Sequence, residues 1–136
     1  MPYSPKEDIG YLFHVALQKL VFLPFAYTMD LWRWKLFTGE IQESNMNEEW
    51  WKLRQNLQGI DAPVPRQNSV DFDPGSKYHI PANVPYIRYF VSFIVQFQFY
   101  EALCKKAGQF DDNDQSGPLF NCDFSLGGEE TGNLIR

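Results

Sequence analysis

The chain has 136 residues, a formal net charge of −5 and a hydrophobic share of 44%. This length and hydrophobic share are typical of a single globular domain and not of a disordered segment, while the acidic balance argues against nucleic acid and membrane surfaces as partners. The aromatic content is high, with 12 Phe, 7 Tyr and 4 Trp, and we expect these large side chains to need more cover than three helices can supply.

The first predicted helix opens on Ser4-Pro5-Lys6-Glu7, a capping box with proline at the first helical position. Pro24 should kink this helix, and the apolar pattern resumes until Thr38-Gly39, which is typical of a helix C-terminus. Because both sides of the second half are apolar, we expect it to be buried all round. Before Pro24, apolar residues recur at spacings of three and four, which places them on one face: Ile9, Leu12, Phe13, Ala16, Leu20 and Leu23.

A short amphipathic helix is predicted from about Asn47, where Glu48 and Glu49 suit the positive end of the helix dipole, to Gly59. Residues 60–85 then form a long loop that is punctuated by prolines and contains an Asp-Pro-Gly turn. Loops of this length are uncommon in compact domains unless they carry function, so this loop is the first place to search for a site.

The third predicted helix runs from about Tyr86 to Gly108 and has apolar residues on more than one face, as expected of a core helix. Its most apolar stretch contains Arg88 and Glu101 among several polar residues, which is too polar for a membrane span, so we predict no spanning helix. The first residues of the chain lack the basic start and apolar run of a signal peptide. Residues 129–136 resemble the opening of a further helix.

A metal site cannot be built from histidines, because the chain has only His14 and His79 and lacks an H-E-x-x-H pair. We interpret His14 as a structural residue of the first helix. A calcium loop at residues 112–117 would offer oxygens at its positions 1, 3 and 5, but its position 12 is Asp123 instead of glutamate and Pro118 follows the glycine. A solvated acidic loop is the favoured interpretation. The sequence has no G-x-S-x-G elbow that would indicate a serine nucleophile.

The two cysteines, Cys104 and Cys122, flank a loop rich in Gly, Asp, Asn and Ser. This arrangement is compatible with a disulfide, and the alternative is a pair of buried free thiols in a cytosolic protein. The residues alone leave both interpretations open, and no Asn-x-Ser/Thr acceptor adds support for secretion.

Hydrogen-bond donors gather at the end of the proline-rich loop. Between Lys77 and Tyr89 the chain supplies an ammonium, an imidazole, a guanidinium and three phenols, with no acid among them. Such a group could receive a carboxylate or a developing oxyanion. The alternative is structural, with the tyrosines and Arg88 packed around a junction between loop and helix.

Several longer stretches of the sequence are specific enough to carry a resemblance to a known family. Around the donor cluster they are Phe-Asp-Pro-Gly-Ser-Lys-Tyr-His-Ile-Pro (72–81), Val-Pro-Tyr-Ile-Arg-Tyr-Phe-Val-Ser-Phe (84–93) and Gln-Phe-Gln-Phe-Tyr-Glu-Ala-Leu-Cys (96–104). Earlier in the chain they are Phe-Leu-Pro-Phe (22–25), Trp-Arg-Trp (32–34) and Glu-Trp-Trp-Lys-Leu-Arg (49–54). With these strings, nearly the whole sequence closely resembles the angiotensin-converting enzyme family of zinc dipeptidyl carboxypeptidases.

The resemblance implies an all-α fold: a large helical ellipsoid with a central channel, of which residues 1–136 form a part that is incomplete at both ends. It implies a zinc cofactor whose H-E-x-x-H ligands, later glutamate ligand and general base lie outside this chain, so the segment alone should be inactive. In the complete enzyme, zinc polarises the scissile carbonyl and activates water. The implied partners are oligopeptide substrates and the remainder of the same peptidase domain.

The resemblance also implies roles for the donor cluster. His79 and Tyr89 match the catalytic donors to the oxyanion, and Lys77 and Tyr86 match the residues that bind the terminal carboxylate of the substrate. A carboxylate held two residues from the cleaved bond implies the release of dipeptides.

Further roles in substrate and chloride binding follow from the resemblance. Trp50 and Arg54 match one chloride site and Arg88 matches a second, each completed by residues outside this chain. Gln18 stands where mammalian members commonly have an acid, so side-chain preference near it can differ. The walls of the substrate pockets on the C-terminal side of the cleaved bond are matched by Lys19, Phe22, Phe25 and Phe93.

Cys104 and Cys122 match a disulfide of the family, although this chain carries an insertion at about 111–115 and an extra residue between positions 66 and 71. We therefore predict a segment of an extracellular zinc peptidyl-dipeptidase, secreted or anchored at the cell surface. The alternatives are a truncated, non-catalytic paralogue that binds peptides, a stapled structural or interaction module, and a calcium-binding module. Met1 can be an initiator or an internal methionine.

Overall fold

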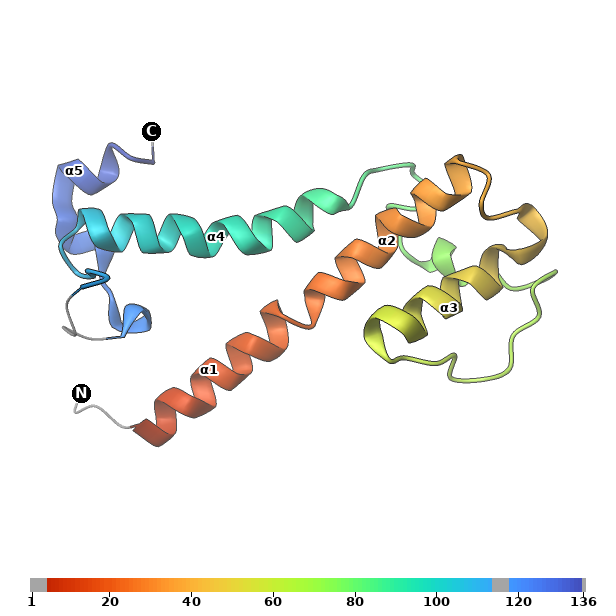
Figure 1. Cartoon of the computed structure of the whole chain (residues 1–136), viewed down its shortest axis with the longest axis horizontal. Coiled ribbons are helices and arrows are strands. Elements are labelled where there is room, and N and C mark those ends of the chain that lie inside the picture. Colours follow the sequence, from red (N-terminus) through yellow and green to blue (C-terminus); the bar gives the residue numbers. More distant parts are fainter. Residues whose placement is uncertain (1–4, 114–117, 136) are drawn as a thin grey trace. The chain divides into compact units, whose positions relative to one another are not determined.

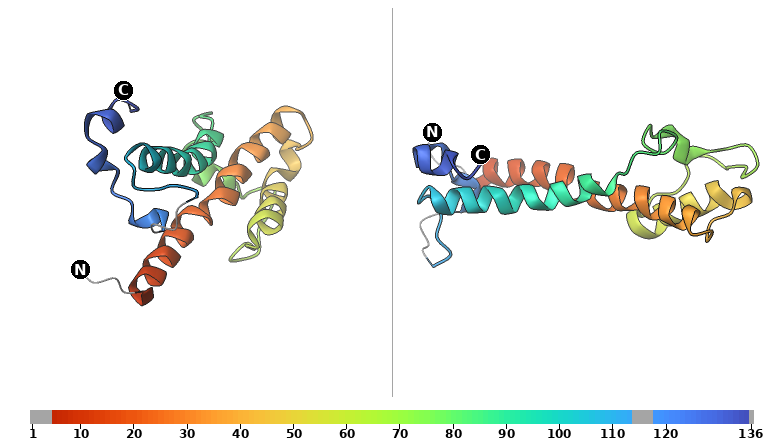
Figure 2. Two further views of the ribbon diagram at one scale, coloured as in Figure 1. Left: turned by 60° about the vertical axis from the view of Figure 1, so that its left-hand side comes forward. Right: turned by 90° about the horizontal axis from the view of Figure 1, so that it is seen from above.

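The computed structural model describes residues 5–113 and 118–135, and within these ranges every regular element is a helix. The predicted all-α fold is thereby confirmed. The chain divides into two compact units, Met1–Val91 and Ser92–Arg136. The first contains helices α1 to α3 and the proline-rich loop, and the second contains most of α4 and the C-terminal elements (Figures 1 and 2).

The first helical stretch is divided in two. Helices α1 (Pro5–Lys19) and α2 (Phe22–Phe37) are separated by a break at residues 20–21. Pro24 explains this position, because its ring excludes the carbonyl four residues earlier and it has no backbone N–H to donate. The predicted interruption is confirmed in the turn that precedes the proline. Ser4, the predicted capping residue, lies outside the described residues.

Helix α2 packs against α3 (Met46–Gln58), and their contact forms the core of the first unit (Figure 1). Trp32 of α2 meets Trp50 of α3 edge to face, with ring centroids 6.3 Å apart. The indole N–H of Trp32 also donates to the backbone carbonyl of Met46 at 3.0 Å. The buried hydrophobic residues of this core are Ala26, Met29, Trp32, Ile41, Trp50 and Tyr86.

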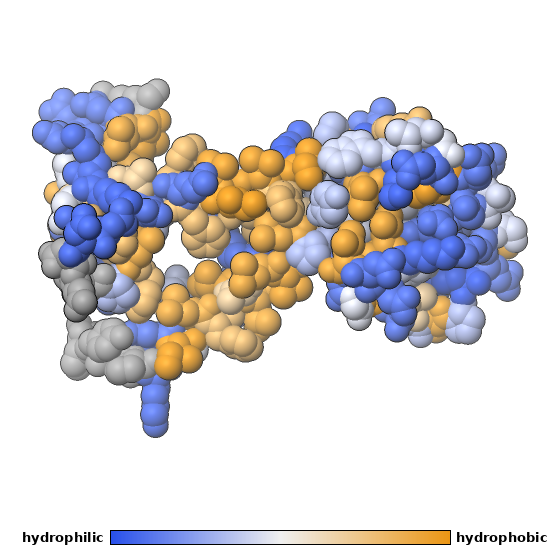
Figure 3. All heavy atoms as spheres, in the orientation of Figure 1, coloured by the Kyte–Doolittle hydropathy of each residue, from blue (hydrophilic) through white to orange (hydrophobic). Residues whose placement is uncertain are grey.

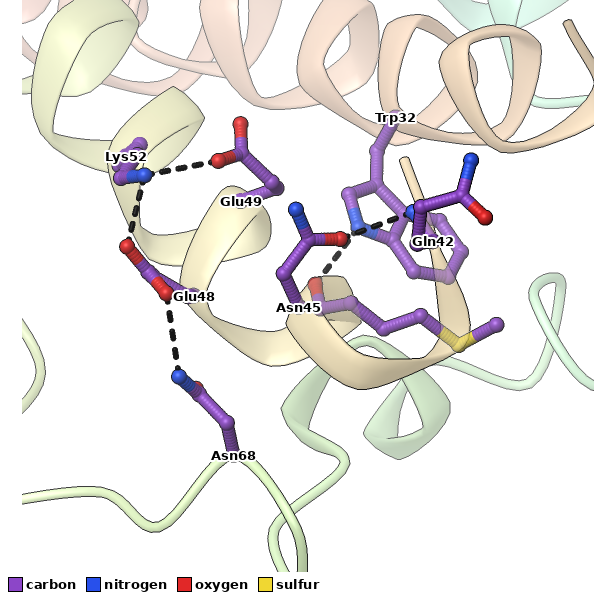
Figure 4. A network of polar contacts seen from close by, with 8 residues as sticks. Trp32, Gln42, Asn45, Glu48, Glu49, Lys52 and Asn68 are labelled. Atoms are coloured by element: carbon purple, nitrogen blue, oxygen red, sulfur yellow. Dashed lines mark hydrogen bonds and ion pairs between the residues drawn. The ribbon is translucent and has the colours of Figure 1, made fainter. Parts of the chain in front are cut away.

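The turn between α2 and α3 is held by polar side chains (Figure 4). It contains the short 3-10 helix η1 (Glu43–Asn45), where the backbone N–H of Gln42 donates to Asn45 Oδ1 at 2.8 Å in a reciprocal capping box. On α3, the ammonium of Lys52 pairs with Glu48, and Asn68 of the following loop donates to the same carboxylate. The start of α3 is thereby tied to the proline-rich loop.

Glycines end both α2 and α3, as predicted. Gly39 and Gly59 have φ values of 80° and 66°, in the left-handed region that glycine adopts without strain. The loop after α3 contains the short 3-10 helix η2 (Asp73–Ser76), which corresponds to the predicted turn. This loop returns the chain to α2 before α4 begins.

Helix α4 (Ile87–Lys106) carries the chain from the first unit into the second. Cys104 and Cys122 form a disulfide with 6.0 Å between their Cα atoms, which confirms the predicted pairing. The hydroxyl of Tyr100 donates to the carbonyl of Cys122 at 2.8 Å, and its ring meets Phe124 edge-on. The remaining elements are η3 (Leu119–Asn121), η4 (Phe124–Gly127) and α5 (Gly128–Gly132), the last of which confirms the predicted C-terminal helix.

The possible calcium loop is only partly described, because residues 114–117 lie outside the described ranges. Asp112 accepts a hydrogen bond from the ammonium of Lys105 at 2.7 Å, so one candidate ligand already faces a cation. Among the described residues, no group of three or more His, Cys, Asp or Glu side chains could hold a metal ion. The described part of this loop gives no support to the calcium interpretation.

Two expectations about burial are wrong. Trp34 and Phe37 are 42% and 65% exposed, so the second half of α2 is not buried all round. On α4, Cys104 is buried, whereas Ile94 and Phe97 are exposed, which is not the pattern of a core helix. The physical reason is that each unit supplies too few elements to cover the apolar faces, which are visible along α1 and α4 (Figure 3). On α1 the exposed apolar residues are Ile9, Tyr11, Leu12, Phe13 and Leu17.

The prediction that there is no spanning helix considered residues 87–104, and a different stretch meets the criteria of length and apolarity for a membrane span. By these two criteria alone, Asp8–Phe37 is long and apolar enough to cross a membrane. Its second half nevertheless contains a buried ion pair between Asp30 and Arg33. Such a pair is characteristic of a helix packed against protein, because charges are costly in lipid.

Candidate functional site

Three aromatic side chains at the end of the proline-rich loop and the start of α4 lie against one another. The rings of His79 and Tyr86 meet edge to face with centroids 4.7 Å apart, and the rings of Tyr86 and Tyr89 are tilted at the same separation. His79 Nε2 lies 3.4 Å from the hydroxyl oxygen of Tyr89. The structure therefore brings together the two residues for which sequence predicts a catalytic role.

Asp30 of α2 fixes the start of α4. The residue is buried, and its Oδ2 accepts the backbone N–H groups of Tyr86 and Ile87, each at 2.7 Å. The first N–H groups of a helix have no partner within the helix, and a carboxylate there also interacts with the positive end of the helix dipole. Asp30 thus sets the position of Tyr86, which immediately precedes α4, and of the first turn of α4, which carries Tyr89.

Arg33 extends this anchor to the loop. Its guanidinium pairs with Asp30 at 2.8 Å and donates to the side-chain oxygen of Asn83 at 2.6 Å. Asn83 has a φ of 51°, a left-handed conformation that asparagine tolerates better than most residues. The two buried side chains are thus paired with each other and hydrogen-bonded, as the burial of opposite charges requires.

Lys77 lies beside the same aromatic group. Its ammonium is 5.2 Å from the centroid of the Tyr86 ring and 5.8 Å from that of Phe25, within the range of a cation–π interaction. Phe22 and Phe25 of α2 both contact the Tyr86 ring, with centroid separations of 6.1 and 5.9 Å. Four of the residues for which sequence predicts substrate binding are therefore neighbours.

The other two residues with a predicted role in substrate binding lie at different places. Lys19 is the last residue of α1, before the break that precedes Phe22. Phe93 lies on α4 in the second unit and is half-buried. Gln18, the substituted position near Lys19, is in hydrogen-bond contact with the ring of His14 at 2.9 Å. His14 is exposed, and this contact joins it to a residue of its own helix.

The surroundings of His79 favour the neutral imidazole. Burial lowers the pKa of His79, and the positive charges of Lys77 and Arg88 lower it further, while Asp30 acts in the opposite direction. Its Nδ1 atom is buried and has no hydrogen-bond partner in the described part of the chain. A neutral imidazole still carries one N–H that can be donated to a ligand.

Arg88 also contacts the hydroxyl of Tyr89. Its guanidinium donates to the hydroxyl oxygen at 3.3 Å and lies 5.0 Å from the ring centroid. The Tyr89 hydroxyl is therefore in contact with two nitrogen groups, one on the loop and one on its own helix. Any ion that holds Arg88 would act on the orientation of Tyr89 through this contact.

Arg54 of α3 forms a second cationic position. Its guanidinium lies over the rings of Phe25 and Trp50, at 5.3 and 5.7 Å from their centroids. Burial lowers the pKa of Arg54, and its Nε is buried without a hydrogen-bond partner among the described residues. A buried donor of this kind fits an anion. Arg54 lines a cleft of about 270 Å³ together with Lys77 and Arg66.

Asp73 joins the proline-rich loop to α3. Its backbone N–H donates to Asn47 Oδ1 at 2.7 Å, and Asn47 Nδ2 donates back to Asp73 Oδ2 at 3.0 Å. The same oxygen accepts the indole N–H of Trp51 at 2.7 Å and pairs with Arg66 at 2.9 Å. Burial raises the pKa of Asp73, but these hydrogen bonds and the charge of Arg66 outweigh it, so the pKa is lowered and the carboxylate stays ionised.

The anchoring residues Asp30, Arg33 and Asn47 had no functional role in the sequence interpretation. A signal existed for the first two, because an acid and an arginine three positions apart lie within a mostly apolar helix. Their partners on the loop are distant in sequence, so only the fold identifies them. Together the residues of the site bring an ammonium, two phenols and an imidazole close to one another, an arrangement suited to binding an anion.

Comparison with known proteins agrees with this description. Residues 2–136 match the family model described as angiotensin-converting enzyme. Angiotensin-converting enzyme of Rattus norvegicus is 53% identical over 130 residues, which are 96% of this chain and 9% of that relative. The enzyme of the same name from Haematobia irritans exigua is 51% identical, with 94% of this chain and 21% of the relative covered. Angiotensin-converting enzyme-like protein Ace3 of Mus musculus is 46% identical, with 96% and 17% covered. The chain thus spans a small part of each relative.

Proposed function

Because this chain belongs to the angiotensin-converting enzyme family, we propose that it forms the substrate-binding part of a peptidase that releases dipeptides from the C-termini of extracellular oligopeptides. In this proposal residues 1–136 act within a larger helical domain. The exposed apolar faces of α1 and α4 support this proposal, since such faces mark surfaces that need a partner.

The observation that carries the proposal is the position of Lys77 beside Tyr86. An ammonium and a phenol can bind the terminal carboxylate of a peptide through charge-assisted hydrogen bonds. The Tyr86 ring also contacts His79 at 4.7 Å, so the carboxylate site adjoins the donors of the reaction centre. A fixed distance between the carboxylate site and the reaction centre would limit the released product to a short C-terminal piece.

His79 and Tyr89 are the proposed donors to the negatively charged oxygen that forms during peptide hydrolysis. Donors that are already in place when this charge develops stabilise the transition state most effectively. The contact of 3.4 Å between the two side chains, and the capping of α4 by Asp30, support such preorganisation. The lowered pKa of His79 keeps the imidazole neutral near pH 7.

The proposed peptidase requires zinc, which would polarise the scissile carbonyl when bound. The described residues contain no group of His, Cys, Asp or Glu side chains that fits the metal. We therefore assign its ligands to residues outside this segment. In this proposal the chain binds the substrate and orients the hydrogen-bond donors His79 and Tyr89.

Chloride is the proposed second cofactor, held in one site by Trp50 and Arg54 and in another by Arg88. The buried, unpartnered Nε of Arg54 supports the first site, and the bond from Arg88 to Tyr89 links the second to a proposed catalytic residue. Replacement Arg54→Gln or Arg88→Gln in the full-length protein should raise the chloride concentration for half-maximal activity by about tenfold, since a hydrogen bond to an ion is worth roughly 1.5 to 3 kcal/mol. Unchanged chloride dependence in both variants would contradict these assignments.

The remaining proposals concern the substrate pockets and the compartment. Lys19, Phe22, Phe25 and Phe93 are proposed to line the pockets for the released residues, because their positions match the family. An extracellular location, secreted or at the cell surface, is supported by the disulfide between Cys104 and Cys122, since disulfides persist in oxidising compartments.

The test compares two substrates in the full-length protein that contains this segment. One oligopeptide has a free C-terminal carboxylate and the other is the same peptide with a C-terminal amide. Lys77→Met should lower kcat/KM for the free peptide by about tenfold to about a hundredfold and change the value for the amide much less, because the amide lacks the charge that Lys77 binds. Lys52→Met, which removes an exposed ammonium from α3, is the matched control.

An equal loss for both peptides would contradict the carboxylate assignment. Binding of the free peptide that depends on Lys77, without any hydrolysis in the presence of zinc and chloride, would instead identify the protein as a non-catalytic peptide-binding paralogue.

A further inference from the structure

The carboxylate of Asp73 is the point at which the proline-rich loop is fixed to α3. Three side chains reach a single oxygen atom of this carboxylate: Asn47 and Trp51 of α3 donate hydrogen bonds to it, and Arg66 of the loop forms an ion pair with it. Asn47 is completely buried and also accepts the backbone N–H of Asp73. A carboxylate that receives this many donors is held in one orientation, because each donor restricts it from a different direction.

The short helix η2 transmits this restraint to Lys77. Asp73 is its first residue, the hydroxyl of Ser76 donates to the Asp73 carbonyl at 2.7 Å, and the backbone N–H of Lys77 donates to the carbonyl of Pro74. Phe72, on the other side of Asp73, lies against Trp32 of the core with ring centroids 6.0 Å apart. The backbone of Lys77 therefore leaves a turn that is fixed at its start.

The side chains of Asp73 and Lys77 lie at the same cleft. Asp73 and Lys77 both line the cleft of about 270 Å³, together with Arg54 and Arg66. Asp73 offsets the charge of Arg66, and the Lys77 ammonium lies over the rings of Phe25 and Tyr86 and, within residues 5–113 and 118–135, not against a carboxylate. Lys77 is thus held by its backbone and two aromatic faces, and its ammonium can bind an anion.

We propose that Asp73 is a positioning residue for Lys77: by fixing η2 to Asn47 and Trp51, it sets the place of the Lys77 ammonium beside Tyr86 and so enforces the selection of substrates with a free C-terminal carboxylate. This inference rests on the proposed function of Lys77. It assigns the selectivity of the peptidase for a free C-terminal carboxylate to a contact between the loop and α3, outside the carboxylate site itself.

The test uses Asp73→Asn in the full-length protein with the same pair of free and amidated peptides. The asparagine keeps the shape of the side chain and can present one oxygen to the donors, but it loses the charge that pairs with Arg66. KM for the free peptide should rise by about tenfold, within the range that misplacement of a binding group by about 1 Å produces, while kcat and the values for the amide change little.

A rescue variant separates positioning from a general loss of structure. In Asn47→Asp/Asp73→Asn the amide and the carboxylate exchange places, so the negative charge returns to this contact and the pair between α3 and η2 keeps both a donor and an acceptor. This variant should recover most of the lost selectivity for the free peptide. In a Lys77→Met background, Asp73→Asn should have no further effect on that selectivity, because the two residues act on the same contact.

The outcomes distinguish a failure of the proposed function of Lys77 from a failure of the positioning role of Asp73. If Lys77→Met fails to discriminate between the peptides, the proposed function itself is lost. If Lys77→Met discriminates but Asp73→Asn raises KM for both peptides equally, or for neither, Asp73 has no positioning role. Should Asp73→Asn not accumulate as folded protein, Trp51→Phe removes one donor to the same oxygen and is judged by the same comparison.

Discussion

The carboxylate of Asp30 accepts the backbone N–H of Tyr86 at 2.7 Å across 56 positions of sequence. Replacement Asp30→Asn removes the negative charge that caps α4 and leaves Arg33 buried without its counter-ion. Loss of one member of a buried pair costs roughly 3 to 5 kcal/mol. We therefore expect the amides of Tyr86 and Ile87 to exchange hydrogen faster by at least about a hundredfold, as measured by mass spectrometry of peptides that cover residues 78–90.

The matched control for this prediction is Glu48→Gln, which removes an exposed carboxylate from α3 and should leave the exchange of residues 78–90 unchanged. Protection in the Asp30→Asn protein equal to that of the unmodified protein would show that another group caps α4.

The helices were largely predictable because their signals are local. Pro24, Gly39 and Gly59 act on the backbone within one turn, and the structure has helix ends or a break at each of them. Burial was less predictable, because the cover of an apolar face depends on which elements are present. Trp34 has the same local pattern as the buried Trp32, yet it faces solvent in this unit.

The site was predictable as a list of residues but not as an arrangement. The donor residues are close in sequence, and the family resemblance supplied their proposed roles. Their support comes from contacts that no local pattern encodes: Asp30 with the start of α4, and Asp73 with Asn47, which is 26 positions away. Such contacts depend on how the proline-rich loop packs against α2 and α3.

The pKa of His79 gives a test by nuclear magnetic resonance. Because the pKa is lowered in the folded protein, the stability that the neutral imidazole contributes is fully present above the unfolded value of 6.5 and is lost as the pH falls through the lowered pKa. The His79 ring signal, assigned with His79→Gln, should therefore titrate with a midpoint below 6.5. Lys77→Met removes one of the charges responsible and should move this midpoint upward.

The midpoint should stay below 6.5 in Lys77→Met, since burial is the larger cause and Arg88 remains. Lys52→Met on α3 is the control and should leave the titration unchanged. A midpoint at or above 6.5 in the unmodified protein would contradict the described surroundings of His79.

The disulfide should stabilise the second unit. It joins residues that are 18 positions apart, and closing a loop of this length stabilises a folded chain by about 3 kcal/mol. Cys104→Ser/Cys122→Ser should therefore unfold at a lower urea concentration than the oxidised protein, as followed by far-ultraviolet circular dichroism. A reducing agent should lower the midpoint of the unmodified protein and leave that of the double variant unchanged; equal midpoints under all conditions would exclude a stabilising role.

The exposed face of α1 predicts the behaviour of the 136-residue chain in isolation. Phe13 and Leu17 are more than half exposed and lie one turn apart on this helix, and contiguous apolar surface of this kind drives association. We expect the chain alone to form oligomers in sedimentation experiments, and Phe13→Gln/Leu17→Gln to shift it towards monomer. Gln18→Glu, a polar change on the same helix, is the control. Because the association should arise from faces that another part of a larger domain would cover, a monodisperse unmodified chain with a cooperative thermal transition would contradict the proposal that these faces need such a partner.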